Sequence, residues 1–430
     1  MNQLSLFLPC AAGVEDFLAQ EVHGLTGLAG DDLLVARGGV TLRAAWRDAL
    51  KLNLCSRLAQ RVLVEVAHAP YRGESDLYDI AGAVAWEAWF TPKHTFKIET
   101  TAQHSPLRSL NFATLKIKDA IADRFRARAG GVRPSIETQW PDVRVFAHLT
   151  ADALTLYIDT SGEALFKRGW RQDKGEAPLK ETLAAAMLAA SGWWDPESGT
   201  VSELPLYDPC CGSGTIAIEA AQIARGIAPG SQRRFGFERL LAHQPHVWDA
   251  IKKEAIQDLC TRAVGTNGSK NGVETRIFGS DVAHRMVDFA ERNAERAGVA
   301  EAVEFRGGDA LQRMPPTHAP GLLLLNPPYG ERIEAAGVAG ARPGGRESAQ
   351  TDDGGEFFSQ LATHWKKHYP GWQAWVLTPD LKLPGRMRLK ESRRVPLWNG
   401  PIECRLFRFD MVKGSAREKP LPTATSGDAA

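Results

Sequence analysis

The stretch Leu206-Tyr207-Asp208-Pro209-Cys210-Cys211-Gly212-Ser213-Gly214-Thr215 decides the fold of this chain. A short apolar strand ends at an acid, and a glycine turn then leads into the start of a helix. Glycines allow a tight turn and a close approach of the backbone to a ligand, and the first turn of a helix offers free N–H groups. The spacing is not the GxGxxG of dinucleotide-binding folds, and a purely structural turn is the alternative. The stretch therefore predicts a strand–turn–helix unit that binds a ligand.

Strands and helices alternate around this unit from about residue 175 to residue 412. Near-continuous apolar strands, such as the four leucines that begin at Leu322, are typical of parallel sheets covered on both faces. The pattern predicts a doubly wound α/β domain. We expect its strands at 205–208, 276–280, 303–306, 322–326 and 373–378, and its helices at 179–190, 215–225, 282–297 and 357–369.

Acidic residues follow the next two predicted strands. Asp281 can accept hydrogen bonds from both hydroxyls of a ribose, and it is equally suited to capping the helix that follows. Asp309, followed by Ala310, suits an adenine amino group, although a solvated loop acid is an equally good interpretation. The candidate cofactor site therefore consists of Asp208, Cys210, Gly212, Gly214, Asp281, Asp309 and Ala310.

The tetrapeptide Asn326-Pro327-Pro328-Tyr329 ends the fourth predicted strand. Its prolines fix the backbone, so that the Asn326 amide oxygen and the Pro327 carbonyl are held as two acceptors. Two converging acceptors suit a planar exocyclic NH₂ group, and Tyr329 offers a face on which a base can stack. Hydrogen bonds at both protons favour a pyramidal nitrogen whose lone pair points at an incoming methyl group. We expect these four residues to be catalytic, and a structural proline turn is the alternative.

In this order the motifs resemble the class I S-adenosylmethionine-dependent methyltransferases that act on amino groups. Over about residues 2–412 the chain resembles the bacterial 23S ribosomal RNA guanine-N2 methyltransferases that carry a THUMP domain. This narrower resemblance rests on the long insert after the first strand and on the stretches Leu115-Lys116-Ile117-Lys118-Asp119, Lys167-Arg168-Gly169-Trp170-Arg171 and Gly330-Glu331-Arg332. Some members continue into a second methyltransferase domain, and we expect the form without it.

The resemblance implies an α/β fold, with a Rossmann-like class I methyltransferase domain preceded by an α+β region that includes a THUMP domain. We expect a ferredoxin-like segment at 1–50, the THUMP domain at 51–165, the methyltransferase domain at 166–412 and a disordered tail at 413–430. The implied cofactor is S-adenosyl-L-methionine. The implied substrate is a guanine in the peptidyl-transferase part of 23S RNA, either naked or in a precursor particle.

Charge is segregated along the chain. With 52 Lys and Arg against 51 Asp and Glu, the net charge of +1 excludes a globally basic surface. Residues 105–134 nevertheless hold an excess of Lys and Arg, and so do residues 381–394. A solvated helix face is the usual fate of such charges. The THUMP resemblance instead favours RNA contact by Lys116, Lys118, Arg124, Arg128, Lys167 and Arg168.

Composition and side signals narrow the class of protein. The hydrophobic fraction of 43% and the charged fraction of 24% are those of a soluble globular protein. No signal peptide or membrane helix is expected, and six irregularly spaced cysteines favour the cytoplasm. The adjacent Cys210 and Cys211 are better explained by packing than as nucleophiles. No metal is expected, because acids and cysteines at ligand spacing are missing around the histidine pairs His243/His246 and His364/His368.

Three functions remain open at this point. The first is methylation of guanine N2 in ribosomal RNA. The second is methylation of another amino group, in transfer RNA, in DNA adenine or in a protein glutamine amide. The third is a non-catalytic RNA-binding assembly factor. The THUMP resemblance disfavours DNA and protein substrates, and the intact strand-end acids and tetrapeptide disfavour the third function.

Overall fold

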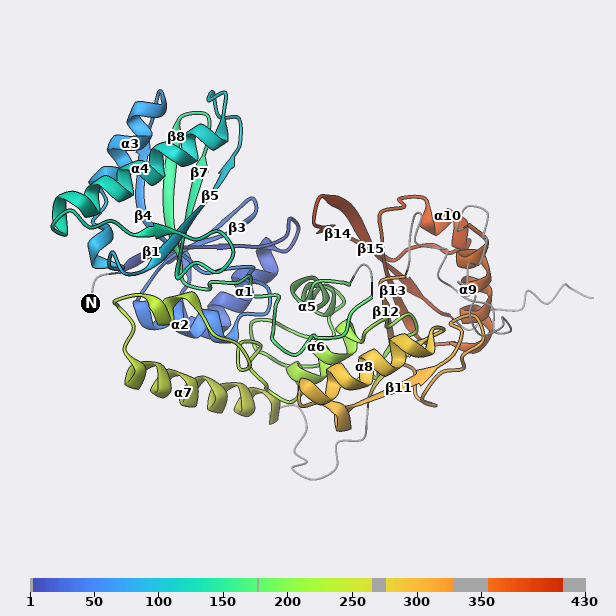
Figure 1. Ribbon diagram of the computed structural model, residues 1–430. Coiled ribbons are helices and arrows are strands. Elements are labelled where there is room, and N and C mark those ends of the chain that lie inside the picture. Colours follow the sequence, from blue (N-terminus) through green and yellow to red (C-terminus); the bar gives the residue numbers. More distant parts are fainter. Residues whose placement is uncertain (1–2, 176–177, 265–275, 328–354, 413–430) are drawn as a thin grey trace, which may run out of the picture.

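The computed structural model describes residues 3–175, 178–264, 276–327 and 355–412, and the side chains of residues 260–264 are outside this description. Two sheets organise the chain (Figure 1). The N-terminal third forms an eight-stranded sheet, and most of the remainder forms a seven-stranded sheet. Within the described residues, no helix is long and apolar enough to cross a membrane.

The N-terminal sheet is mostly antiparallel, with β5 parallel to its neighbours β6 and β7. Its order is β2-β3-β1-β4-β8-β7-β5-β6. Strand β4 joins the β2-β3-β1 part of this sheet to the β8-β7-β5-β6 part. Its Val64 pairs with Leu6 of β1, and along its length β4 also pairs with β8. The predicted limit at residue 50 lies inside α2. The elements are β1 Leu4–Pro9, α1 Glu15–Thr26, β2 Leu33–Ala36, β3 Gly39–Ala44, α2 Trp46–Cys55, β4 Leu63–Pro70, α3 Glu74–Ala83, β5 Thr95–Ala102, α4 Leu110–Arg128, β6 Ser135–Ile136, β7 Val143–Leu149 and β8 Ala153–Asp159.

The second sheet has the order β11-β10-β9-β12-β13-β15-β14. The five strands β9 to β13 are parallel to one another, as predicted, and both ends of each strand lie within one residue of the expected limits. The last two strands are antiparallel and were not predicted. The elements are α5 Glu181–Ala190, β9 Leu206–Asp208, α6 Thr215–Ala224, α7 Pro245–Val264, β10 Ile277–Asp281, α8 His284–Arg296, β11 Val303–Gly307, β12 Leu322–Leu325, α9 Gly355–His368, β13 Gln373–Thr378, α10 Leu383–Met387, β14 Arg393–Asn399 and β15 Ile402–Asp410.

Strand β12 shows why this sheet is covered on both faces. All four of its leucines are buried. Leu322 and Leu324 face the core built with α5 and α6, whereas Leu323 and Leu325 face a second core built with α9. Since successive side chains of a strand point to opposite faces, a run of leucines requires helices on both sides. The doubly wound fold is thereby confirmed.

Strand β9 lies between β10 and β12, because the chain runs outward from β9 to β11 and then crosses to the other side of β9 to form β12. In open α/β sheets, the crevice at such a switch point, beyond the carboxyl ends of the strands, is where ligands bind. Asp208, Asp281 and Asn326 all stand at this carboxyl edge.

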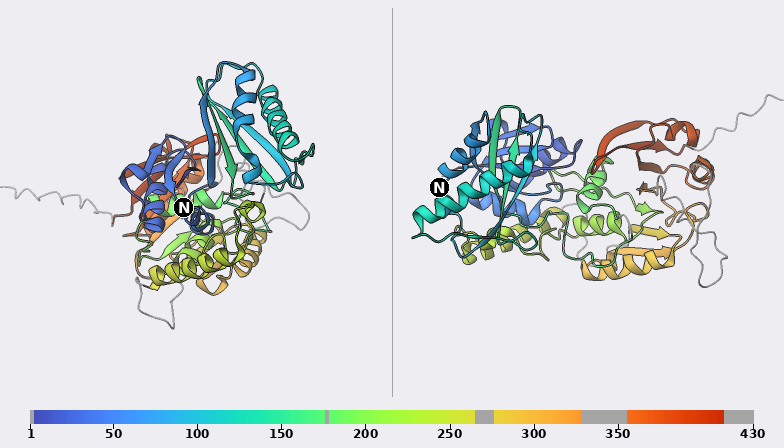
Figure 2. Two further views of the ribbon diagram at one scale, coloured as in Figure 1. Left: turned by 90° about the vertical axis from the view of Figure 1, so that its left-hand side faces the viewer. Right: turned by 45° about the horizontal axis from the view of Figure 1, so that its top comes forward.

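The segment between α6 and β10 connects the region of the first sheet to the region of the second sheet. The amide of Gly230 donates to the Leu54 carbonyl at 2.9 Å, and the amide of Phe237 donates to the Thr160 carbonyl at 2.8 Å. Helix α7 runs along α2 (Figures 1 and 2), where Lys51 pairs with Asp258 at 3.0 Å. Backbone hydrogen bonds and ion pairs therefore both span the junction.

Candidate active site

The glycine turn presents its backbone to open space. Gly212 and Gly214 have φ angles of 52° and 86°, in the region that favours glycine. A side chain at Gly214 would approach Ala290 and Phe305 at 3.0 Å, so this glycine is needed for packing of the turn. Beside Gly212, by contrast, nothing lies within 4 Å of the place where a side chain would begin. A ligand can therefore approach the backbone at Gly212.

Asp281 fastens the turn to the second strand. One of its carboxylate oxygens accepts the Gly212 N–H at 2.9 Å, and the other accepts the Ala283 N–H at 2.9 Å. Helix α8 begins after Ala283, so Asp281 is not the N-cap residue of that helix. An ionised carboxylate has about four acceptor positions. Two of them remain for hydroxyl groups of a ligand, which fits a ribose.

Asp208 is buried, with 2% of its surface exposed. Its Oδ1 accepts the Cys210 N–H at 3.0 Å, and thus shapes the entry into the turn. Burial, together with the nearby charge of Asp281, raises the pKa of Asp208 to about 8. Its carboxyl group is consequently protonated near neutral pH, and its contact with the turn is to the backbone.

The third strand ends close to the second. The Gly308 N–H donates to the Asp281 carbonyl at 3.0 Å, which ties the two strand ends together. The Oδ1 of Asp309 accepts the Leu311 N–H at 2.9 Å, and Ala310 is buried. Asp309 therefore orders its own loop beside Asp281, as a residue that lines a nucleoside site would.

Asn326 holds an unsatisfied acceptor at the end of β12. Among the described residues, its buried Oδ1 has no hydrogen-bond partner. A buried polar atom without a partner typically costs about 1–3 kcal/mol, and such atoms in native proteins usually have a functional reason. Pro327 is buried beside it. The predicted catalytic residues Pro328 and Tyr329 lie outside the described residues. A donor on a substrate would satisfy the Asn326 oxygen.

Arg171 and Asn293, which the sequence did not single out as site residues, form hydrogen bonds with the glycine turn. Arg171 donates to Glu181 at 2.8 Å, to Ser213 Oγ at 3.1 Å and to Thr215 Oγ1 at 2.8 Å. Asn293 of α8 donates to the Ser213 carbonyl at 3.1 Å. Arg171 belongs to one of the stretches behind the resemblance, which was a usable signal. Asn293 is 80 residues from the turn, and nothing local marks it.

The paired cysteines are unsuited to nucleophilic chemistry. Burial and the neighbouring acids raise the pKa of the Cys210 and Cys211 thiols well above the usual value. The thiolate, not the thiol, is the nucleophile. These cysteines therefore pack against the turn as small neutral groups.

The structure corrects one predicted RNA contact. Arg168 is 1% exposed, donates to Glu219 at 3.1 Å and to the Arg57 carbonyl at 2.8 Å, and cannot reach a large ligand at the surface. Arg124 is engaged as well, since it donates to both carboxylate oxygens of Glu87 and to the Gly82 carbonyl. The remaining predicted cations are half-buried or exposed on the surface, and they are Lys116, Lys118, Arg128 and Lys167.

The arrangement fits a nucleoside-containing methyl donor. The open backbone at Gly212 and the free acceptor positions of Asp281 suit a ribose, and Asp309 lies beyond them in the loop after β11. On the other side of β9, the Asn326 Oδ1 is a buried acceptor without a partner among the described residues. Among the described residues, no cluster of His, Cys, Asp and Glu could hold a metal ion.

Three families match consecutive parts of the chain. Residues 168–408 match the family described as "RMKL-like, methyltransferase domain", which is more than half of the chain. Residues 71–159 match "THUMP domain", and residues 5–63 match "RlmL ferredoxin-like domain". The predicted arrangement of an N-terminal region with a THUMP domain before a class I methyltransferase domain is confirmed. The limits assigned to each domain remain predictions.

Curated relatives match nearly the whole chain. The ribosomal RNA large subunit methyltransferase K/L of Shewanella oneidensis is 36% identical over 420 residues, which are 97% of this chain and 54% of the relative. The protein of the same name from Psychromonas ingrahamii is 36% identical over 97% of this chain and 52% of its own length. The chain thus spans about half the length of the curated relatives it matches.

Solved structures share both the fold and the arrangement of domains. SMU.472, a protein described as a methyltransferase and crystallised in complex with SAH, superposes with a TM-score of 0.78 and 27% identity over 95% of this chain and 98% of its own. A Listeria monocytogenes protein named as a predicted N6-adenine-specific DNA methylase gives a TM-score of 0.77 at 28% identity over 95% and 96% of the two chains. The superposition therefore includes the N-terminal region.

Proposed function

Because this chain belongs to the RMKL-like methyltransferase domain family, we propose that it methylates the exocyclic N2 amine of a guanine in 23S ribosomal RNA. The observation that carries the proposal is the buried Oδ1 of Asn326, which has no hydrogen-bond partner among the described residues and stands at the carboxyl edge one strand from the glycine turn. The THUMP domain and the ribosomal RNA methyltransferase name of the curated relatives support RNA as the substrate.

The cofactor is S-adenosylmethionine, in keeping with a methyltransferase family and with the SAH held by a related structure. When bound, it supplies an electrophilic methyl group. We assign its ribose to Asp281 and its adenine to the loop at Asp309 and Ala310. Gly212 lets the backbone approach it, and Asp208, Cys210 and Gly214 keep the turn in shape.

Asn326 acts on the substrate amine. Its Oδ1 accepts one N–H of the guanine amino group, and the Pro327 carbonyl is assigned the other. These bonds draw the nitrogen out of conjugation with the ring and aim its lone pair, which favours the transition state over the ground state. The proton released after transfer goes to solvent, so no general base is required. Stacking of the guanine on Tyr329 remains a prediction.

A guanine inside a helix is out of reach of this edge, so the enzyme must take an unstacked or extruded base. Contacts between the N-terminal region and RNA phosphates then set where the RNA lies on the enzyme and how fast it associates. They do not select a sequence. We assign this role to Lys116, Lys118 and Arg128 of α4, and to Lys167.

Digestion of 23S RNA to nucleosides tests the proposal. RNA from cells that lack the gene is incubated with the purified chain and a labelled methyl donor, and the expected product is N2-methylguanosine. In the same assay, Asn326→Ala should lower kcat by at least about a hundredfold while cofactor affinity changes little, because its acceptor acts chiefly at the transition state. N6-methyladenine as the product, or methylation of DNA in preference to RNA, would refute the proposal.

A further inference from the structure

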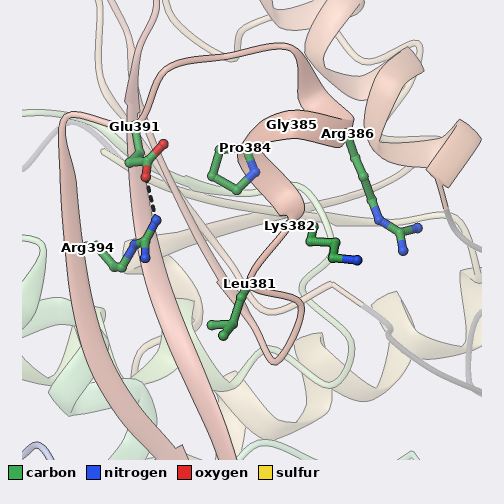
Figure 3. Close-up of a pocket in the computed structure, with 7 residues that line it drawn as sticks. All are labelled: Leu381, Lys382, Pro384, Gly385, Arg386, Glu391 and Arg394. Carbon is green, nitrogen blue, oxygen red and sulfur yellow. Dashed lines mark hydrogen bonds and ion pairs between the residues drawn. The ribbon is translucent and has the colours of Figure 1, made fainter.

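A basic pocket opens where the chain leaves β13 at the carboxyl edge of the second sheet. It has a volume of about 560 Å³ and is lined by Leu381, Lys382, Pro384, Gly385, Arg386, Glu391 and Arg394. Figure 3 shows Lys382 and Arg386 on one side of the pocket, and the Arg394–Glu391 pair on the other. We call these lining residues the α10 pocket.

The charges of the α10 pocket favour an anion. The lining holds three cations, all exposed, and a single carboxylate. Arg394 donates to Glu391 at 2.6 Å, and Arg386 pairs with Asp380 at 2.8 Å, so both guanidinium groups are oriented. Within the described part of the chain, Lys382 forms no ion pair. The surrounding segment adds further exposed cations, namely Arg388, Lys390 and Arg393.

The pocket is built on an anchored element. Leu383 and Met387 of α10 are fully buried in the core that α9 shares. The Arg388 carbonyl accepts a hydrogen bond from Lys366 of α9 at 3.0 Å. A cation displayed from a fixed backbone loses less conformational freedom on binding than one on a free loop.

Its position relates it to the substrate. Strands β12 and β13 are parallel neighbours, with Leu325 paired to Val376, so Asn326 and the segment after Thr378 emerge at the same edge. The glycine turn and Asp281 lie on the other side of β12, toward β9 and β10. The α10 pocket is therefore on the substrate side of Asn326, away from the cofactor.

We propose that the α10 pocket binds a backbone phosphate of single-stranded RNA next to the base that enters at Asn326. Guanidinium groups bind phosphate through paired hydrogen bonds, and an ammonium adds a point charge. A nucleotide drawn toward Asn326 brings its neighbouring phosphodiesters with it, and a fixed phosphate fixes the register of the strand. The inference rests on RNA being the substrate.

The test compares two triple variants of the full chain, each of which removes three exposed cations. Lys382→Ala/Arg386→Ala/Arg394→Ala removes the pocket cations. Arg225→Ala/Arg292→Ala/Arg306→Ala removes the cation that follows α6, one of α8 and one of β11, at the other side of the sheet. Binding of a labelled, guanine-containing single-stranded RNA is measured at several salt concentrations, and cofactor binding is measured by calorimetry.

For the pocket variant, we expect RNA affinity to fall at least about tenfold and the salt slope to decrease by about 0.7, the value for one phosphate of a single strand, at unchanged cofactor affinity. The control variant should change both RNA quantities much less. Arg386→Lys/Arg394→Lys, which keeps the charge, should restore most of the slope. Equal losses in the two triple variants, or a wild-type slope without the pocket cations, overturn the inference. If wild type binds RNA through the pocket but makes no N2-methylguanosine, the proposed function fails and the pocket stands.

Discussion

At the scale of single residues, Asp281 carries two tasks at once. Its carboxylate accepts the N–H groups of Gly212 and Ala283 and so shapes the glycine turn, and in the proposed function its remaining acceptor positions bind the ribose. Under this proposal one carboxylate both preorganises the site and binds at it.

We expect Asp281→Asn to weaken S-adenosylmethionine binding by about tenfold to a hundredfold in calorimetry. A hydrogen bond to a charged group contributes roughly 1.5–3 kcal/mol, and the amide retains the size of the side chain but loses an acceptor oxygen. Glu304→Gln, on the edge strand β11, serves as the control and should bind normally. If Asp281→Asn binds S-adenosylmethionine with wild-type affinity, then Asp281 does not bind the ribose of the cofactor.

The buried acid Asp208 should make stability depend on pH. Its pKa is raised from 3.8 to about 8, so the folded chain keeps this proton where the unfolded chain has lost it. Its contribution is full below about pH 4 and is lost as pH rises to about 8, at up to about 1.4 kcal/mol per pH unit. Asp208→Asn cannot titrate. Relative to wild type, its free energy of unfolding in urea should therefore rise from about pH 6 to about pH 8. A difference that is independent of pH would mean that Asp208 is ionised when folded.

At the scale of elements, the sequence predicts best where its signals are local. The parallel strands were found because apolar runs end at glycine or at short polar residues, and the glycine turn marked the first βα unit. Strands β14 and β15 were missed, since Arg393 and Arg394 begin the first of them and alternate burial is interrupted by exposed cations. Arg168 was assigned to RNA contact on the strength of the THUMP resemblance, but it is buried. Its partner Glu219 is 51 residues away, and only the fold brings them together.

Helix α4 carries basic residues of two kinds. Some are assigned to RNA contact, whereas Arg124 is engaged in contacts within the fold, and substitutions should distinguish the two. Lys116→Ala/Lys118→Ala/Arg128→Ala should raise the KM for RNA several-fold and reduce its salt slope by about 2, with cofactor affinity unchanged. Arg124→Ala should instead lower the midpoint of thermal unfolding, because it breaks the contacts with Glu87 and the Gly82 carbonyl. If the triple variant keeps the RNA affinity and the salt slope of wild type, these three side chains are only solvated and do not contact RNA.

At the scale of the whole molecule, a buried ionic cluster joins the halves. Glu219 of α6 is fully buried between Arg57 and Arg168, with contacts of 3.1 Å to each. Arg57 follows α2 of the N-terminal region, and its amide donates to Glu21 of α1 at 2.7 Å. Because α6 begins at the glycine turn, this cluster connects the N-terminal region to the glycine turn through packed elements. The distance between the two is thereby fixed.

Removing the carboxylate tests this connection. Glu219→Ala leaves two buried guanidinium groups without their shared partner, and breaking such a cluster typically costs about 3–5 kcal/mol. We expect a large fall in the urea midpoint and a transition that splits in two as the halves lose their coupling. The KM for RNA should rise even in conditions where the variant is folded, because position on the RNA no longer aligns the base with Asn326, whereas cofactor affinity should stay within a few-fold of wild type. Glu301→Ala is the matched control, since it removes a carboxylate that pairs with Arg225 at the surface, and it should change none of these quantities. A single transition near the wild-type midpoint for Glu219→Ala would show that the two halves are joined by the α2–α7 contact and the backbone bonds of the insert instead.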